Sequence, residues 1–283
     1  MKIIKMIKSE YTGWIFNARI LLMPCVFILI YSFVTKNLLA YSDRMGTPIN
    51  LLEPFIGICN SPQLLGLIPL VFLVLISDFP RVDNNMIYKI FRAGRRKWLI
   101  SQLLFLLFAD ISFVFLLFIG VTLPIADSGF LFNGWSDVVT EMNQKMPELS
   151  STFTSKLIPP NLYYQMLPYA ALIYSVLLLV LYLYLLGGLL LVLKLIGHKI
   201  LGVVVTGFVL VLGTGLAQFQ LPIQWIFPAS HGLLQSHFSS YFRELYCPLE
   251  YSVFYFLLLI FLLVFTAFWY APKISYTKII QIN

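Results

Sequence analysis

Six apolar segments constrain this 283-residue chain more than any other feature of its sequence. Each is close to the roughly 20 residues that a helix needs to cross a bilayer, and a chain in lipid must satisfy its backbone hydrogen bonds internally. The predicted spans are residues 14–34, 58–77, 98–120, 168–193, 200–218 and 251–270. With 60% hydrophobic and 11% charged residues, the composition excludes a soluble domain of ordinary size. We expect one all-α polytopic membrane domain over residues 1–283.

The positions of the basic residues predict the orientation. With both termini inside, 14 of the 19 Lys and Arg residues are cytoplasmic: Lys2, Lys5, Lys8, Arg19, Arg81, Lys89, Arg92, Arg95, Arg96, Lys97, Lys194, Lys199, Lys273 and Lys278. Five lie outside: Lys36, Arg44, Lys145, Lys156 and Arg243. Cytoplasmic loops carry the excess of Lys and Arg in membrane proteins. We therefore expect cytoplasmic termini, and the net charge of +7 does not indicate nucleic-acid binding.

Residues 1–15 are predicted to form an amphipathic helix in the membrane interface, leading into the first span. One broad face is apolar, and Lys2, Lys5, Ser9 and Thr12 lie opposite. The apolar face consists of Ile3, Ile4, Ile7, Tyr11 and Trp14.

A second short amphipathic helix is predicted within residues 79–97, on the cytoplasmic side. Asp83 is a good N-cap, and Gly94 suits the left-handed position after the last turn. Four apolar residues share one face: Met86, Ile87, Ile90 and Phe91. Arg95, Arg96 and Lys97 then reach the lipid headgroups, with Trp98 as interfacial anchor.

Both long outer loops, residues 126–165 and 219–250, contain helical patterns. In the first, apolar residues recur at helical spacing after Ser136 or Asp137 and before Pro147: Trp135, Val138, Val139, Met142, Met146 and Leu149. In the second, a helix capped by Ser230 would carry Leu234, Phe238, Tyr241, Phe242 and Leu245, after breaks at Pro222 and Pro228. This second loop is either a surface loop or a re-entrant segment that dips into the membrane surface.

Asp110 lies near the middle of the third span, about 18 Å along the helix from Trp98. A carboxylate at that depth costs about 2.5–3.5 kcal/mol on insertion scales, so it is expected to face the bundle interior or a wet cavity. Two interpretations stay open: a group in a substrate or proton pathway, or a protonated structural residue hydrogen-bonded to another span.

A stripe of small residues marks one face of the fifth span: Gly202, Thr206, Gly213 and Ala217. Small residues let helices approach closely in lipid. The stripe predicts either a seam between two chains or packing within one bundle.

Motifs for catalysis and metal binding are absent from the sequence. It contains no G-x-x-x-x-G-K-[ST], H-E-x-x-H or G-x-S-x-G pattern, so no catalytic, cofactor or metal site is predicted. His231 and His237 are six residues apart, off a common helical face, and are expected to be polar surface residues. His198 is expected in a basic cytoplasmic turn. Cys59 and Cys247 are predicted just outside the membrane, where they are either paired or free.

This arrangement resembles the membrane permease subunit of bacterial type-2 ABC exporters. The resemblance covers nearly the whole chain, as architecture: an N-terminal interfacial helix, six spans with both termini inside, and a helical outer loop before the sixth span. The strongest local match is the helix from Asp83 to Gly94, followed by Arg95-Arg96-Lys97-Trp98. The long outer loop after the third span is a departure from many relatives.

The resemblance implies a multi-pass protein of the bacterial cell membrane that is not itself an enzyme. ATP and Mg²⁺ would be bound by a separate ATPase subunit, which docks on a coupling helix whose residues are Asp83, Met86, Ile87, Ile90, Phe91, Arg92 and Arg95. A second permease chain, identical or related, would complete the pathway for a peptide, antibiotic or other amphipathic molecule. The alternatives are a non-transporting immunity or assembly protein, and an intramembrane enzyme with a nucleophile and base converging within the spans.

Overall fold

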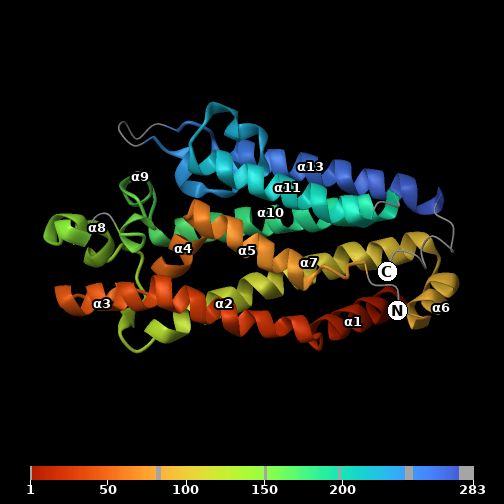
Figure 1. Ribbon diagram of the computed structural model, residues 1–283, viewed down its shortest axis with the longest axis horizontal. Coiled ribbons are helices and arrows are strands. Elements are labelled where there is room, and N and C mark those ends of the chain that lie inside the picture. The colour runs from red at the N-terminus through yellow and green to blue at the C-terminus, as the bar shows by residue number, and fades with distance from the viewer. Residues whose placement is uncertain (1, 81–83, 150–151, 197–198, 240–244, 274–283) are drawn as a thin grey trace.

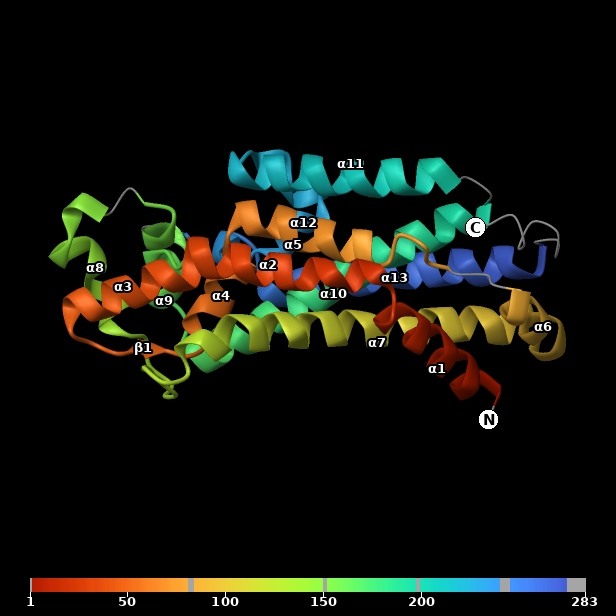
Figure 2. The same cartoon turned by 60° about the horizontal axis from the view of Figure 1, so that its bottom comes forward.

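The computed structural model describes residues 2–80, 84–149, 152–196, 199–239 and 245–273. These residues form an elongated bundle whose long helices run along one axis (Figures 1 and 2). Within the described residues, five helices are long and apolar enough to cross a membrane, and a sixth crossing results if one bent pair is counted as a span. The predicted all-helical polytopic architecture is therefore confirmed.

The first two helical segments are separate, as predicted, but the first span is longer than expected. Helix α1 (Lys2–Ile15) ends before Asn17, whose side chain accepts a hydrogen bond from the Arg19 N–H at 3.1 Å. The following 28 residues, Ala18–Met45, form one candidate span. It consists of η1 (Ala18–Leu21), α2 (Leu22–Ile30), the wider turn η2 (Tyr31–Thr35) and α3 (Lys36–Met45).

Helix α1 packs on α7 (Arg95–Thr122), a contact that the predicted interfacial helix did not include. Its buried line is Met6, Glu10 and Trp14, while Ile4 is 70% exposed. Polar contacts with α7 accompany this packing. Gln102 Nε2 donates to the Glu10 carboxylate at 3.3 Å, and the Tyr11 and Ser112 hydroxyls lie 2.6 Å apart.

The predicted span over residues 58–77 is not one straight helix, and it counts as a crossing only as part of a bent pair. The chain instead forms α4 (Glu53–Asn60) and α5 (Pro62–Leu75), which meet at an angle of 87°. Pro62 disfavours helical geometry at the preceding residue, and Ser61 is accordingly extended, with ψ at 124°. All of α4 is buried, and Asn60 Nδ2 donates to the Ile56 carbonyl and the Ser175 hydroxyl. The backbone at the break is also hydrogen-bonded, because the Ser61 N–H donates to the Gly57 carbonyl at 3.0 Å and the Leu65 N–H to the Ser61 carbonyl at 2.8 Å.

The centre of the bundle is α10 (Pro168–Ile196), which contacts α13 (Leu249–Tyr270), α11 (Lys199–Gln218), α7, α4 and α5. Gly187 allows α7 to approach closely, because a Cβ at this position would lie 2.5 Å from Leu106 Cδ1. Short turns η3 (Leu123–Ile125) and η8 (Ala271–Lys273) extend α7 and α13.

The first outer loop has the predicted helix. Helix α8 (Asp137–Lys145) is capped by Ser136, whose hydroxyl accepts from the Val139 N–H at 3.4 Å, and Val138 and Met142 are buried. Pro147 begins the separate turn η4 (Pro147–Leu149). The rest of the loop contains η5 (Thr154–Lys156) and α9 (Pro160–Tyr163). Strand β2 (Gly129–Phe130), within this loop, pairs in parallel with β1 (Ile49–Asn50).

The helix predicted for the second outer loop is wrong. Turn η6 (Pro222–Ile226), helix α12 (Pro228–Gly232) and turn η7 (Leu234–His237) replace it. Phe238 is extended and forms an antiparallel bridge with Leu245, while Tyr241 and Phe242 lie outside the described residues. Pro228 begins α12 after Phe227, so Ser230 lies inside the helix and does not cap it. The loop returns into the bundle, because every residue of α12 is buried.

Candidate functional site

Helix α6 (Asn84–Ala93) lies at one end of the bundle, joined to the start of α7 (Figures 1 and 2). Ile90 is buried against the chain, whereas Tyr88 is 71% exposed and Phe91 is 55% exposed. The sequence placed Ile90 and Phe91 on one face that would contact one partner. In the structure only Phe91 is exposed, so the two residues do not contact the same surface. Arg92 is exposed too. Asp83, and the side chains of Met86 and Ile87, lie outside the described part of the chain.

Gly94 forms the junction between α6 and α7. Its φ of 86° is positive, as predicted, but its ψ of 154° is extended and not left-handed helical. Only glycine adopts this conformation readily. The sharp change of direction lets α6 stop and α7 start at the next residue, Arg95.

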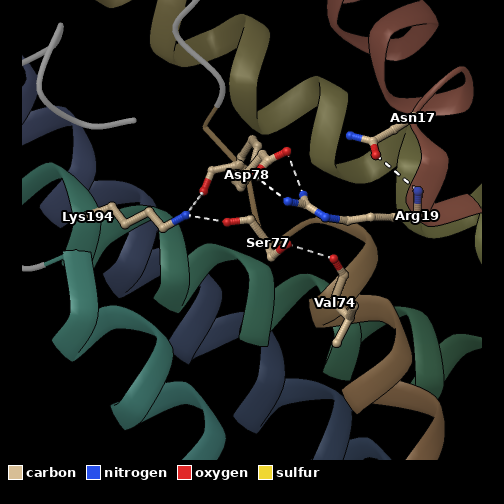
Figure 3. A network of polar contacts seen from close by, with 7 residues as sticks. Asn17, Arg19, Val74, Ser77, Asp78 and Lys194 are labelled. Atoms are coloured by element: carbon tan, nitrogen blue, oxygen red, sulfur yellow. Dashed lines mark hydrogen bonds and ion pairs between the residues drawn. The ribbon is translucent and has the colours of Figure 1, made fainter.

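The segment that precedes α6 is held by a buried lysine of α10. Lys194 is 5% exposed, and its ammonium donates to the Ser77 carbonyl at 2.8 Å and the Phe79 carbonyl at 2.6 Å (Figure 3). Both carbonyls follow the C-terminal end of α5, where a cation is favoured by the helix dipole. The contact fastens the linker that enters α6 to the central helix of the bundle.

An ion pair holds the same linker from the other side. The guanidinium of Arg19, in η1, contacts the Asp78 carboxylate at 2.6 and 2.8 Å (Figure 3). These side chains are 36% and 48% exposed, so the pair is worth little in stability. Its effect is positional: it connects η1, at the start of the first candidate span, to the segment between α5 and α6. A small recess lined by Glu10, Trp14 and Phe105 lies beside it.

The segment that follows α6 is also connected to a distant helix. Arg95, the first residue of α7, donates from Nη1 to the carbonyl of Pro272 at 2.5 Å. Pro272 lies in η8, directly after α13. Together with Lys194 and Arg19, this contact connects the two ends of α6 to η1, α10 and the end of α13.

Asp110 is buried completely, as its predicted interior position requires. Neither of its carboxyl oxygens has a hydrogen-bond partner among the described residues. The hydrogen bond to another span that one interpretation invoked is therefore not present in the described part of the chain. A buried polar group without a partner is costly, and among the described residues of α7 Asp110 is the carboxyl group in this position, in addition to the unpaired Trp98 Nε1 and Gln102 Oε1.

The small-residue stripe of α11 faces the chain's own interior. Thr206 and Ala217 are buried, and a Cβ on Gly213 would lie 3.0 Å from the Ala229 Cβ of α12. A Cβ on Gly202 would lie 3.4 Å from the Leu193 Cβ of α10. These contacts are packing within one bundle.

The prediction that His231 and His237 are surface residues is wrong. Both are completely buried, as is Ser252 of α13, and Cys247 is 8% exposed. Burial lowers the pKa of His231, and it lowers the pKa of His237 to about 4. The four side chains meet because α12, η7 and the start of α13 pack together, which residue spacing alone does not reveal. Cys59 and Cys247 are both free thiols, and His198 lies outside the described residues.

A buried carboxylate was likewise not predicted from the sequence. Glu53, the first residue of α4, accepts hydrogen bonds from the Ser136 N–H at 2.6 Å and the Ser136 hydroxyl at 2.7 Å. It also accepts from the Asn50 N–H at 3.3 Å. Glu53 thereby ties the first outer loop to the bundle.

The chain matches no family model, no curated protein and no solved structure.

Proposed function

We propose that this chain is the permease subunit of an ABC exporter, driven by a separate ATPase subunit that docks on α6. The observation that carries the proposal is the placement of α6 at one end of the bundle, between two candidate spans, with Tyr88 and Phe91 exposed and Ile90 buried. An amphipathic helix that presents aromatic side chains is suited to a groove on a partner protein.

The contacts on either side of α6 supply a route for mechanical coupling. A force on α6 reaches α10 through Phe79 and Lys194, and it reaches the end of α13 through Arg95. It also reaches the first span through Asp78 and Arg19. A ligand shifts a conformational equilibrium only by its differential affinity for the two states. In this mechanism, the ATPase dimer closed on ATP prefers a displaced position of α6.

A second permease chain, identical or related, would complete the transport pathway. The faces of α11 and α13 that point away from the bundle are apolar and exposed, including Phe208, Val211, Phe261 and Phe265. In a membrane these faces contact lipid or the second chain. The proposed cargo is a peptide, antibiotic or other amphipathic molecule that is exported across a bacterial cell membrane. In this proposal α6 lies on the cytoplasmic side. ATP and Mg²⁺ are assigned to the partner ATPase.

The experiment that tests the proposal is purification of the tagged chain from membranes of its host. Wild type should carry an ATPase subunit, identified by mass spectrometry and by ATP hydrolysis. The Tyr88→Ala, Phe91→Ala double variant should insert normally and lose at least about 90% of that ATPase, because two exposed aromatic anchors of this kind dominate interface energies.

The matched control is Tyr246→Ala, which removes an aromatic side chain that is 70% exposed, in the second outer loop. This variant should retain the ATPase at the wild-type level. If wild type purifies without any P-loop ATPase, the exporter proposal is wrong. An immunity or assembly role would then become the leading explanation.

A further inference from the structure

Three side chains that commonly bind metals converge in the second outer loop. The Nδ1 or Nε2 atoms of His231 and His237 and the Sγ of Cys247 all lie within 4.8 Å of one another. The Ser252 hydroxyl lies between them, 2.7 Å from His231 Nδ1, 2.7 Å from His237 Nε2 and 3.9 Å from Cys247 Sγ. Four polar atoms are thus gathered in one buried cluster.

The second nitrogen of each imidazole fixes its tautomer. His231 Nε2 lies 2.8 Å from the Trp225 carbonyl oxygen, and His237 Nδ1 lies 2.9 Å from the Leu233 carbonyl oxygen. A carbonyl only accepts, so these two nitrogens carry the protons. In the neutral rings, His231 Nδ1 and His237 Nε2 therefore present lone pairs toward Ser252.

This arrangement leaves more acceptors than donors at the centre. The Ser252 hydroxyl has one proton, which can satisfy only one of the two imidazole lone pairs. At the other imidazole, a nitrogen lone pair would then face a lone pair of the Ser252 oxygen at 2.7 Å, with no proton between them. A cation at the centre removes this conflict. Imidazoles that donate their outer N–H to backbone carbonyls, with the inner nitrogen directed to a common point, are the usual arrangement around a bound metal.

We propose that His231 Nδ1, His237 Nε2 and Cys247 Sγ bind a divalent transition metal, with Zn²⁺ as the best match, and that the Ser252 hydroxyl is the fourth ligand. Two imidazoles and one thiolate favour zinc over magnesium or calcium, which prefer oxygen ligands. In a tetrahedral site with ordinary Zn–N and Zn–S lengths, ligand atoms lie about 3.3–3.6 Å apart. The separations in the cluster, from 2.7 Å to no more than 4.8 Å, bracket this spacing.

The surroundings indicate a structural site, closed to substrate. The Tyr255 ring stacks on His231 with centroids 4.0 Å apart, and the Trp225 ring lies 5.3 Å from both imidazoles. His231, His237 and Ser252 have no exposed surface. Binding replaces the S–H bond of Cys247 with a metal–sulfur bond, and the released proton leaves to solvent. No oxidant or reductant takes part.

The metal would connect three pieces of chain that meet only in the folded protein. His231 lies in α12, His237 in η7 and Ser252 in the first turn of α13, while Cys247 comes just before α13. The site would hold the returning loop against the last span. A metal that binds only the folded protein stabilises it by mass action. This inference is independent of the proposed transport function.

A competing chemical reading is a serine nucleophile with a histidine base. Ser252 Oγ is within hydrogen-bond reach of two imidazoles. However, its complete burial gives a substrate no access, and the thiol of Cys247 has no part in such a pair. A serine-reactive fluorophosphonate probe distinguishes the two readings. The metal site predicts no labelling of Ser252 in the folded protein.

The test uses the full chain in detergent, stripped with a chelator and titrated with Zn²⁺ or Co²⁺. Wild type should bind one metal ion per chain, and the Co²⁺ form should show a thiolate-to-cobalt charge-transfer absorption. Cys247→Ser and His237→Asn should each weaken binding by more than about 100-fold, beyond the loss typical for outer-shell partners. Cys25→Ser, which removes an exposed thiol outside the cluster, should bind as wild type does.

A second measurement needs no variant. Zn²⁺ should slow alkylation of Cys247 by a maleimide at least about tenfold, as read by mass spectrometry, while the alkylation of Cys25 stays unchanged. The inference is overturned if folded wild type binds neither ion, if Cys247→Ser binds with wild-type affinity, or if Zn²⁺ leaves Cys247 alkylation unchanged. Labelling of Ser252 by the fluorophosphonate would also overturn it.

Discussion

Lys194 of α10 donates a hydrogen bond to the carbonyl of Phe79 at 2.6 Å, although 115 residues separate the two. The same ammonium donates to the Ser77 carbonyl at 2.8 Å. The linker that leads into α6 is therefore attached to the most central helix of the bundle. These two hydrogen bonds connect the segment before α6 to α10. Their loss should therefore lower the stability of the protein and weaken the coupling between α6 and the bundle.

Lys194→Met should lower the free energy of unfolding by about 1.5–3 kcal/mol, the range for hydrogen bonds to a charged group. Thermal unfolding of the purified protein measures this change. The variant should also uncouple ATP hydrolysis from transport in the assembled complex. Lys156→Met, at an exposed lysine of the first outer loop, should change neither quantity. Equal stability of wild type and Lys194→Met would refute the anchoring role.

Glu53→Gln should destabilise the first outer loop by about 1–3 kcal/mol. The amide can accept from the Ser136 N–H, but its NH₂ group then faces the other donors that the carboxylate satisfied, including the Asn50 N–H. Faster limited proteolysis within residues 126–165, together with a lower melting temperature, would show the effect. Glu141→Gln removes an exposed partner of Lys145 and should leave both readouts unchanged, because an exposed ion pair adds little stability.

Gly94→Ala should disturb the direction of α6 without a steric clash. No atom lies within 4 Å of an added Cβ, so the cost comes from the backbone conformation alone, at about 1–3 kcal/mol. The amount of ATPase that co-purifies should fall. Gly46→Ala is the control, because Gly46 also has a positive φ, 66°, with open space around it, but it ends α3. That variant should lose stability and keep the ATPase; equal ATPase loss in both would contradict the role of Gly94.

Asp110→Asn should preserve expression and melting temperature, because the amide occupies the same space without a potential buried charge. Asp110→Lys should sharply reduce the yield of folded protein, because it would bury a longer, positively charged side chain at a position that has no exposed surface. Fluorescence-detected size-exclusion chromatography separates these outcomes, with the exposed Asp127→Asn as control. A well-folded Asp110→Lys protein would show that this position has access to water. Loss of transport in a folded Asp110→Asn protein would assign the carboxyl group to the pathway.

The excess of Lys and Arg on one side predicts that α6 and α1 face the cytoplasm. Single cysteines in a cysteine-free background test this with a membrane-impermeant maleimide on intact cells. Asp127→Cys and Glu141→Cys, both in the first outer loop, should be labelled directly. Arg92→Cys and Lys8→Cys should be labelled only after permeabilisation. The reverse pattern would invert the proposed direction of the whole assembly.

Local signals in the sequence determined much of this fold. The long apolar runs predicted the membrane helices because satisfaction of the backbone in lipid leaves few alternatives. The Ser136 cap of α8 and the positive φ of Gly94 each follow from the chemistry of one or two adjacent residues. The helical pattern in α6 also placed a short element between two spans.

Only the tertiary structure decided which faces meet. Helical spacing grouped Ile90 with Phe91, but Ile90 belongs to the buried core and Phe91 is exposed. Spacing separated His231 from His237, yet a break in the helix at Leu233 turns both rings toward Ser252. The partners of Glu53 and Lys194 lie 83 and 115 residues away. The periodicity of apolar residues reports on a few turns of one helix. Whether a side chain is buried depends on distant segments that pack against that helix, and the sequence pattern does not show which segments these are.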